Sequence, residues 1–393
     1  MIDYDSALSA RVKDIAPSGI RKFFDLLENM NSEDTISLGV GEPDFVTPWH
    51  IRDAGVYALE KGFTKYTSNA GLMELRREIS RYLRRRFDLS YDPAGQIIIT
   101  VGGSEGIDIA VRAIVNQGDE VIIPAPSFVC YAPIVELVGG VPVFVETKAE
   151  DEFRLTAEAL RAAITPRTKL LVLPFPNNPT GAIMERADLA AVADVLRDTN
   201  IIVLSDEIYA ELTYGTRHVS IANLPDMYER TLVVNGFSKS YAMTGWRMGY
   251  VCGPQPLIRQ MLKIHQYAIM CAPTTSQYAA LEAMRTGDGD ILSMCRDYDY
   301  RRRFLLDKLH AAGLECFEPK GAFYAFPCIR STGMTSAEFC EQFLIREHVA
   351  AIPGNAFGPG GEGFVRMCYA SSLANLSDAM DRLERFLGST RMA

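Results

Sequence analysis

The segment V-V-N-G-F-S-K-S-Y-A-M-T-G-W-R-M-G-Y occupies residues 233–250. The β-branched run from Thr231 to Val234 predicts a buried strand, and Gly236 favours the end of that strand. Lys239 is therefore expected in a turn just beyond a strand end. An amine between two serines, with Arg247 eight positions later, suits a Schiff base to a ligand that carries a phosphate. The alternative is a solvated surface lysine.

Short apolar runs alternate with helical patterns through the middle of the chain. Strands are predicted at residues 96–101, 120–123, 141–145, 168–173, 201–204 and 231–234, with a further candidate at 248–252. Helical patterns fall between several of them, as at residues 107–115 and 187–196. Strands with intervening helices indicate an α/β domain around a mostly parallel sheet.

Distinctive residues follow the carboxyl ends of five predicted strands. They are Gly103 with Ser104, Phe128, Asn178, Asp206 and Lys239. In open α/β sheets, ligands bind in the crevice outside the carboxyl ends of the strands. These positions therefore predict a single binding site.

The ends of the chain predict a second, smaller domain. A helical pattern from Gly19 to Met30 precedes an apolar strand from Thr35 to Leu38. After about residue 285, amphipathic helices mix with short strands, at residues 298–312, 322–326, 336–347, 364–369 and 375–387. We expect a large domain at residues 46–285 and a small α+β domain built from residues 1–45 and 286–393.

The composition argues against several kinds of partner. The net charge of −9 and the pI near 5.3 argue against nucleic acid and anionic membranes. Basic clusters at residues 81–86 and 301–303 lie in mixed-charge helical patterns and are interpreted as solvated helix faces. No apolar run approaches the roughly 18 residues of a membrane span. The N-terminus does not have the pattern of a signal peptide.

Cysteine and histidine usage predicts a cytoplasmic protein without a metal. The eight cysteines are scattered, and the five histidines have no metal-site or triad spacing. A G-x-G-x-x-G pattern at residues 358–363 contains Pro359 and precedes a strand-like segment, so we do not interpret it as a dinucleotide site.

Two further motifs lie upstream of the lysine segment, N-N-P-T-G at residues 177–181 and S-D-E-I-Y at residues 205–209. In this order the three motifs resemble the class I aminotransferases of the pyridoxal phosphate fold-type I superfamily. The likeness runs from about Ser37 to about Leu387. The resemblance implies an α/β large domain with a smaller α+β domain, pyridoxal 5′-phosphate as cofactor, and a homodimer with shared active sites.

The resemblance also implies roles around the cofactor ring. Lys239 would form the Schiff base and, once displaced by substrate, act as general base and acid. Asp206 would pair with the pyridine nitrogen, which compensates a partly buried carboxylate; a helix N-cap is the alternative. Tyr209 and Asn178 would donate hydrogen bonds to the ring oxygen O3′, and Phe128 would stack on the ring. An ordinary core-edge tyrosine and a turn asparagine are the alternatives.

The phosphate is expected at the turn of residues 102–106, which includes Gly103 and Ser104. This turn lies between a strand and a helix predicted to start near Ile107, and helix N-termini bind anions. Ser238 and Arg247 would complete the cradle.

Tyr66 and Gly236 concern two further contacts to the phosphate that the family pattern includes. By resemblance, Tyr66 would reach the phosphate held by the other subunit; by itself it is interpreted as a turn tyrosine. Gly236 stands where many relatives have serine, so a phosphate contact from that position is not expected.

The substrate carboxylate is expected at Arg366, an arginine inside an apolar strand-like run. Without the resemblance, an internal salt bridge would be the better interpretation. Gly41, in the turn G-E-P-D-F, and Asn178 are further candidate substrate contacts. Arg21 is a candidate for a distal carboxylate, with an ordinary surface charge as the alternative.

The resemblance therefore predicts an aminotransferase that moves an α-amino group from an L-amino acid to a 2-oxo acid by a ping-pong mechanism. The acceptor is expected to be 2-oxoglutarate, and the donor an aromatic, acidic or N-acetyl-LL-diaminopimelate-like amino acid. A pyridoxal phosphate-dependent cysteine-conjugate β-lyase is one alternative. A non-catalytic regulator that binds the cofactor is another, although no DNA-binding segment is recognised before residue 30.

Overall fold

A mixed sheet forms the centre of the protein in the computed structural model, which describes residues 2–17, 19 and 34–390. Within those residues the sheet has seven strands in the order β2-β8-β7-β6-β5-β3-β4, and β8 alone runs opposite to the other six. The bounds are β2 (Ile97–Thr100), β3 (Glu120–Ala125), β4 (Val141–Glu146), β5 (Thr168–Leu173), β6 (Ile202–Asp206), β7 (Thr231–Gly236) and β8 (Gly249–Cys252). The predicted strands and the mostly parallel sheet are confirmed.

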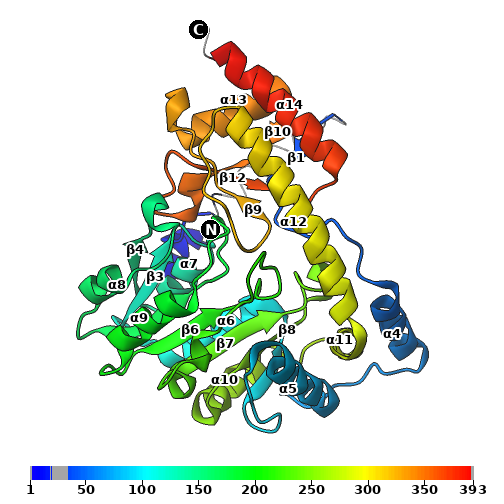
Figure 1. The fold of residues 1–393 in the computed structure, drawn as a ribbon. Helices are drawn as coiled ribbons and strands as arrows, with labels where there is room; N and C mark the ends of the chain where they lie inside the picture. Colours follow the sequence, from blue (N-terminus) through cyan, green and yellow to red (C-terminus); the bar gives the residue numbers. More distant parts are fainter. Residues whose placement is uncertain (1, 18, 20–33, 391–393) are drawn as a thin grey trace.

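Helices cover both faces of this sheet (Figure 1). Successive strand residues point to opposite faces, so Ile98 packs with α6, α7 and α10, whereas Ile97 and Ile99 pack with α5 and α11. Helices α8 and α9 cover Leu171 and Val203. The bounds are α4 (Trp49–Glu60), α5 (Met73–Phe87), α6 (Gly102–Ile114), α7 (Tyr131–Leu137), α8 (Ala157–Ala163), α9 (Arg186–Leu196), α10 (Gln255–Ala268) and α11 (Thr274–Thr286).

Helix α6 begins at Gly102, so the predicted start near Ile107 is wrong. The predicted turn of residues 102–106 is the first turn of the helix. A Cβ atom on Gly249 of β8 would lie 2.5 Å from the carbonyl carbon of Gly102. The helix N-terminus reaches the sheet this closely because Gly249 has no side chain.

The C-terminal segments lie above the sheet in Figure 1, with α12 running from α14 down toward α11. Helix α12 begins at Asp288, ten residues before the predicted start at Tyr298. Strands β11, β12 and β9 form an antiparallel sheet, and β1 pairs in parallel with β10. The bounds are β1 (Ile36–Ser37), α12 (Asp288–Ala311), β9 (Tyr324–Ala325), α13 (Ser336–Glu347), β10 (Val349–Ala350), β11 (Ile352–Pro353), β12 (Val365–Cys368) and α14 (Leu373–Thr390).

The N-terminal segment contributes to both parts of the chain. Strand β1 belongs to the C-terminal part, whereas α2 (Ala10–Lys13), which follows α1 (Tyr4–Ala7), contacts α7. The guanidinium of Arg11 donates a hydrogen bond to the carbonyl of Leu137. The helical pattern predicted from Gly19 to Met30 lies outside the described residues apart from Gly19. The division into residues 46–285 against 1–45 and 286–393 stays a prediction.

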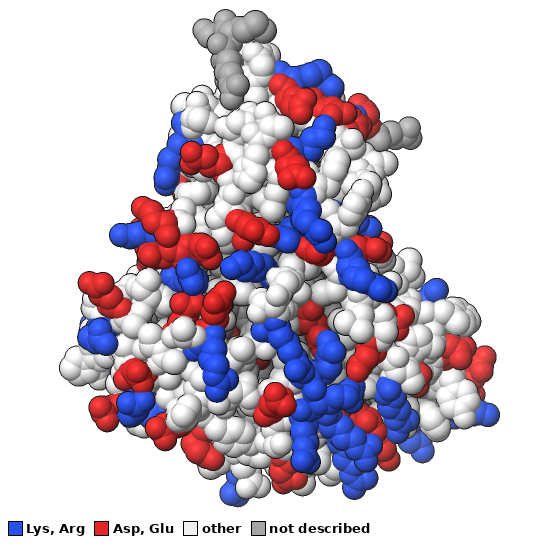
Figure 2. All heavy atoms as spheres, in the orientation of Figure 1, with Lys and Arg blue, Asp and Glu red and all other residues white. Residues whose placement is uncertain are grey.

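Basic residues gather on the lower part of the face in Figure 2, where Figure 1 places α5. Several have acidic partners, including Arg81 with Glu78 and Arg85 with Asp288. This mixed-charge surface agrees with the interpretation of residues 81–86 as part of a solvated helix face. The same interpretation is wrong for residue 302 of the second basic cluster, because Arg302 is only 6% exposed. Within residues 2–17 and 34–390, no helix combines the length and apolar character needed to cross a membrane.

Candidate active site

A cavity of about 630 Å³ opens at the carboxyl ends of the parallel strands. It brings together most of the residues predicted to form the site. Those lining it are Gly41, Gly103, Ser104, Phe128, Asn178, Asp206, Tyr209, Ser238, Lys239, Arg247 and Arg366. The five strand-end positions thus converge on one cavity, as the topology requires.

Lys239 follows β7 and points its amine into this cavity. Its Nζ atom donates a hydrogen bond to the carbonyl of Gly41 at 2.7 Å and lies 5.7 Å from the ring centroid of Phe323. Burial lowers the pKa of Lys239 to about 8 because it disfavours the ammonium form. The amine therefore loses its proton far more readily than an exposed lysine.

Asp206 is the last residue of β6 and is only 7% exposed. Its carboxylate accepts hydrogen bonds from the hydroxyl of Tyr131 at 2.7 Å and from the backbone N–H of Ile208 at 3.2 Å. Burial raises the pKa of Asp206, and the Tyr131 hydrogen bond opposes that rise. A cationic ligand group beside this carboxylate would relieve the cost of burying the charge. Sequence reasoning missed Tyr131, whose spacing of three residues after Phe128 is the one hint available.

The N-terminus of α6 and the guanidinium of Arg247 lie side by side at the cavity. A Cβ atom on Gly102 would lie 2.5 Å from Nη2 of Arg247. The guanidinium is further fixed by a 3.0 Å hydrogen bond from Nη1 to the carbonyl of Thr244. Free backbone N–H groups, the helix dipole and a cation together make an anion site.

Gly236, the departure from the family pattern, has a structural explanation. A Cβ atom there would lie 2.9 Å from the carbonyl oxygen of Met248 and 3.1 Å from Cα of Gly249. A serine would crowd the β7–β8 pair at this point.

Arg366 lies in β12 and is 3% exposed. Its guanidinium is placed between two aromatic rings, with ring centroids 4.6 Å away for Tyr324 and 4.9 Å away for Phe357. Nη1 donates to Oδ1 of Asn178 at 2.9 Å, and Nη2 donates to the carbonyl of Gly39. The buried Nε has no hydrogen-bond partner among the described residues. These neighbours are neutral, so the positive charge of the guanidinium is free to bind a carboxylate.

Tyr324 is a second lining residue that sequence reasoning missed. Its hydroxyl lies 2.8 Å from the hydroxyl of Tyr209. Two residues earlier, Ala322 has a φ of +55°, and its carbonyl accepts hydrogen bonds from the hydroxyls of Tyr214 and Tyr369. These bonds hold a backbone conformation that alanine rarely adopts.

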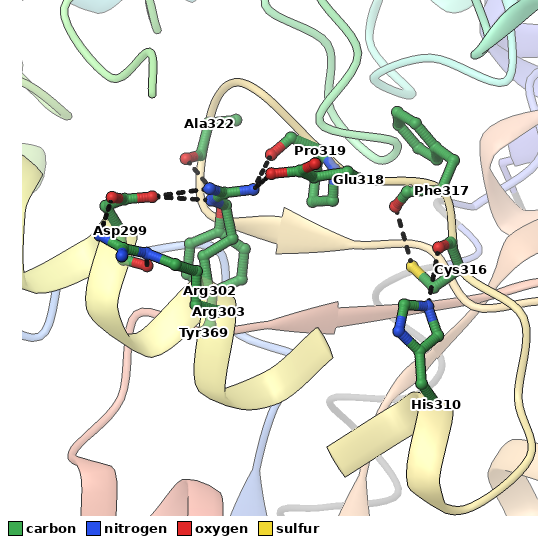
Figure 3. A network of polar contacts seen from close by, with 10 residues as sticks. All are labelled: Asp299, Arg302, Arg303, His310, Cys316, Phe317, Glu318, Pro319, Ala322 and Tyr369. Atoms are coloured by element: carbon green, nitrogen blue, oxygen red, sulfur yellow. Dashed lines mark hydrogen bonds and ion pairs between the residues drawn. The ribbon is translucent and has the colours of Figure 1, made fainter. Parts of the chain in front are cut away.

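The segment before Tyr324 is attached to α12 through Arg302 (Figure 3). Its guanidinium donates to Glu318 at 2.7 Å, to the carbonyl of Pro319 at 3.2 Å and to Asp299 at 2.8 Å. Arg302 therefore fixes the chain that leads into the cavity.

Of the predicted residues that the structure describes, one is not at the cavity of this chain. Tyr66 is 82% exposed and does not line it. Arg21 lies outside the described residues.

The comparisons with known proteins agree with this geometry. A family model described as aminotransferase class I and II matches residues 33–383. YugH of Bacillus subtilis (strain 168), named as an aminotransferase, is 53% identical over 98% of this chain and 99% of its own length. A protein of the same strain, named as a probable N-acetyl-LL-diaminopimelate aminotransferase, is 45% identical over 98% of this chain and 97% of its own length.

Among solved structures, the aromatic aminotransferase from Pyrococcus horikoshii OT3 has a TM-score of 0.90 and is 43% identical, covering 95% of this chain and 100% of that chain. The chain therefore belongs to the class I and II aminotransferases, a family of pyridoxal phosphate-dependent transferases.

Proposed function

We propose that this aminotransferase moves the α-amino group of an L-amino acid to a 2-oxo acid, with 2-oxoglutarate as the acceptor. The observation that carries the proposal is that one cavity joins Lys239, the buried Asp206, Arg366 and the α6 N-terminus beside Arg247. These groups provide an amine, an acid, a carboxylate clamp and an anion cradle. Transamination on pyridoxal phosphate needs all four.

The residues present fit pyridoxal 5′-phosphate. Asp206 would hold the protonated pyridine nitrogen, and this pairing would compensate its buried charge. The N-terminus of α6, including Gly103 and Ser104, would hold the phosphate together with Arg247 and Ser238. Phe128 would cover the ring, while Asn178 and Tyr209 would bind its O3′ oxygen.

The bound cofactor supplies an electron sink that weakens the bond between the substrate Cα and its hydrogen. Arg366 would orient the substrate by binding its α-carboxylate with two parallel hydrogen bonds, while Gly41 and Asn178 line the same region. Nζ of Lys239 would take up the proton released from Cα, and its pKa of about 8 suits that exchange near neutral pH.

A ping-pong order follows from this proposal. Amino donor and 2-oxo acceptor both carry an α-carboxylate, and Arg366 is the clamp proposed for each. Two substrates cannot occupy one clamp at once, so the donor product leaves before the acceptor binds.

A homodimer is part of the proposal. Apolar side chains are exposed on α4 and in the loop that leads from it to Tyr66; they include Trp49, Tyr57, Leu59 and Phe63. A second copy of the chain placed over them would remove this apolar surface from water. Tyr66 would then contact the phosphate held by the other subunit.

The donor class is proposed as aromatic, acidic or N-acetyl-LL-diaminopimelate-like. Relatives named for an aromatic substrate and for N-acetyl-LL-diaminopimelate support this range. The aromatic side chain of Tyr324 in the cavity offers apolar surface for a donor side chain.

The test is product analysis with a panel of L-amino acids, with and without 2-oxoglutarate. Without acceptor, each active site should convert one donor molecule to its 2-oxo acid and then stop. With 2-oxoglutarate, glutamate should accumulate, and double-reciprocal plots should be parallel. Release of pyruvate and ammonia from cysteine conjugates without acceptor would identify a β-lyase instead.

Arg366→Leu should lower kcat/KM for donor and acceptor alike, by about 30-fold or more, because a buried charged contact is lost. Arg330→Leu is the matched control, since Arg330 packs on the ring of Phe364 and does not line the cavity. An unchanged kcat/KM in Arg366→Leu would remove the carboxylate clamp from the proposal.

A further inference from the structure

Glu105 lies in the first turn of α6, directly after Ser104 of the proposed phosphate site. Ser104 and Ile107 line the cavity, whereas Glu105 does not. Its Oε2 atom accepts the backbone N–H of Val101 at 2.5 Å, and its Oε1 atom lies 2.6 Å from Nδ1 of His265. An acidic side chain is therefore held one residue away from an anion site, turned away from the cavity.

His265 lies on α10 and has a fully buried side chain, with 0% exposure. Since a carboxylate accepts hydrogen bonds, Nδ1 is the donor of the pair. Nε2 has no hydrogen-bond partner among the described residues. Glu105 is thus the one hydrogen-bonding partner of the ring within the described chain, and a buried polar ring needs it.

A carboxylate at this place has two opposing effects. In the first turn of a helix it is favoured by the helix dipole. Beside a bound phosphate, however, it repels the ligand and competes for the same N–H groups. The outcome depends on where the carboxylate points, and the His265 hydrogen bond fixes that direction.

We propose that His265 is a positioning residue that holds the Glu105 carboxylate on the Val101 N–H, which leaves the remaining N–H groups of the α6 N-terminus to the cofactor phosphate. This inference rests on the proposed phosphate site at α6. Without the Nδ1 donor, Glu105 can turn toward the phosphate and weaken its binding.

The test compares the dissociation constants of two probes for the cofactor-free protein, pyridoxal 5′-phosphate and pyridoxal, by fluorescence titration. Pyridoxal has the ring and aldehyde but no phosphate. A purely structural defect weakens the binding of both probes equally, whereas a misplaced Glu105 weakens the binding of the phosphorylated probe only. The ratio of the two constants therefore isolates the phosphate contribution.

The informative variants are His265→Asn and His265→Gln. The asparagine amide places a donor near the position of Nδ1, whereas the glutamine amide reaches toward the position of Nε2. His265→Asn should keep the wild-type ratio, and His265→Gln should lower the preference for the phosphorylated probe by about tenfold. Adding Glu105→Gln to His265→Gln should restore the preference, because the displaced group is no longer charged.

His218→Leu is the matched control. His218 forms a buried pair with Glu207, with Nε2 3.0 Å from Oε2, and neither residue lines the cavity. In His218→Leu the ratio of the dissociation constants of the two probes should stay at the wild-type value. Thermal unfolding of each cofactor-free variant shows that it is folded under the titration conditions.

Equal ratios in wild type, His265→Asn and His265→Gln would overturn the inference and leave the phosphate site intact. A wild-type protein that binds pyridoxal as tightly as pyridoxal 5′-phosphate would instead refute the proposed phosphate site itself.

Discussion

Burial sets the proton affinity of Lys239, the residue on which the proposed chemistry depends. The folded protein lowers the pKa of this amine to about 8, mainly because the cavity disfavours a charged ammonium. The ammonium form therefore predominates below that pH, and the neutral amine above it. In the unfolded chain the same amine should have the ordinary lysine pKa of about 10.4.

This difference predicts how Lys239 reacts with an amine-directed label in the cofactor-free protein. Labelling by acetic anhydride, followed by mass spectrometry of the peptide, should have its midpoint at about pH 8. In denaturant the midpoint should move to about 10.4. Equal midpoints in the two states would show that burial does not control this amine.

At the scale of elements, helix α12 holds the chain that enters the cavity. Arg302 is 7% exposed at its side chain and connects Asp299 on α12 with Glu318, whereas Arg303 is 65% exposed and pairs with the same Asp299. The two arginines are adjacent, which provides a matched comparison of a buried and an exposed ion pair (Figure 3).

Arg302→Ala should lower the free energy of unfolding by about 2 kcal/mol or more, since it removes a buried side chain that packs on the ring of Tyr214 and leaves the buried carbonyl of Pro319 without its partner. Arg303→Ala should change it by less than about 0.5 kcal/mol. Urea unfolding measures both values. The rate of backbone hydrogen exchange between residues 318 and 324 should also rise in Arg302→Ala but not in Arg303→Ala. An unchanged rate in Arg302→Ala would show that α12 does not position Tyr324.

At the scale of the whole molecule, the proposed dimer places Tyr66 of one chain and Lys239 of the other in the same active site. Lys239→Ala should be inactive, and Tyr66→Phe should have weakened cofactor binding. In a mixed dimer of these variants, one of the two sites contains both wild-type residues. Random mixing should restore about one quarter of the wild-type activity.

The check is to mix the two variants after mild dissociation and to measure activity and cofactor content. Mixing wild type with Lys239→Ala controls for loss during the procedure. Activity that never exceeds the average of the separate variants would place Tyr66 outside the neighbouring site.

The sequence by itself determined the succession of strands along the chain, the mostly parallel sheet and most of the cavity lining. Apolar runs with a strand period are local patterns, and parallel strands must end at the same edge. Strand ends alone were therefore enough to group Lys239, Asp206, Asn178, Phe128 and Ser104 in one cavity. The spacing from Lys239 added Arg247, and the family resemblance added Arg366, which strand periodicity alone could not connect to the site.

Only the tertiary structure revealed the partners that tune these residues. Tyr131 is 75 residues from Asp206, Tyr324 is 115 residues from Tyr209, and His265 is 160 residues from Glu105. No local periodicity encodes contacts over such separations, because they depend on how helices and loops pack on the sheet. The start of α6 at Gly102 was decided in the same way, by close packing against β8.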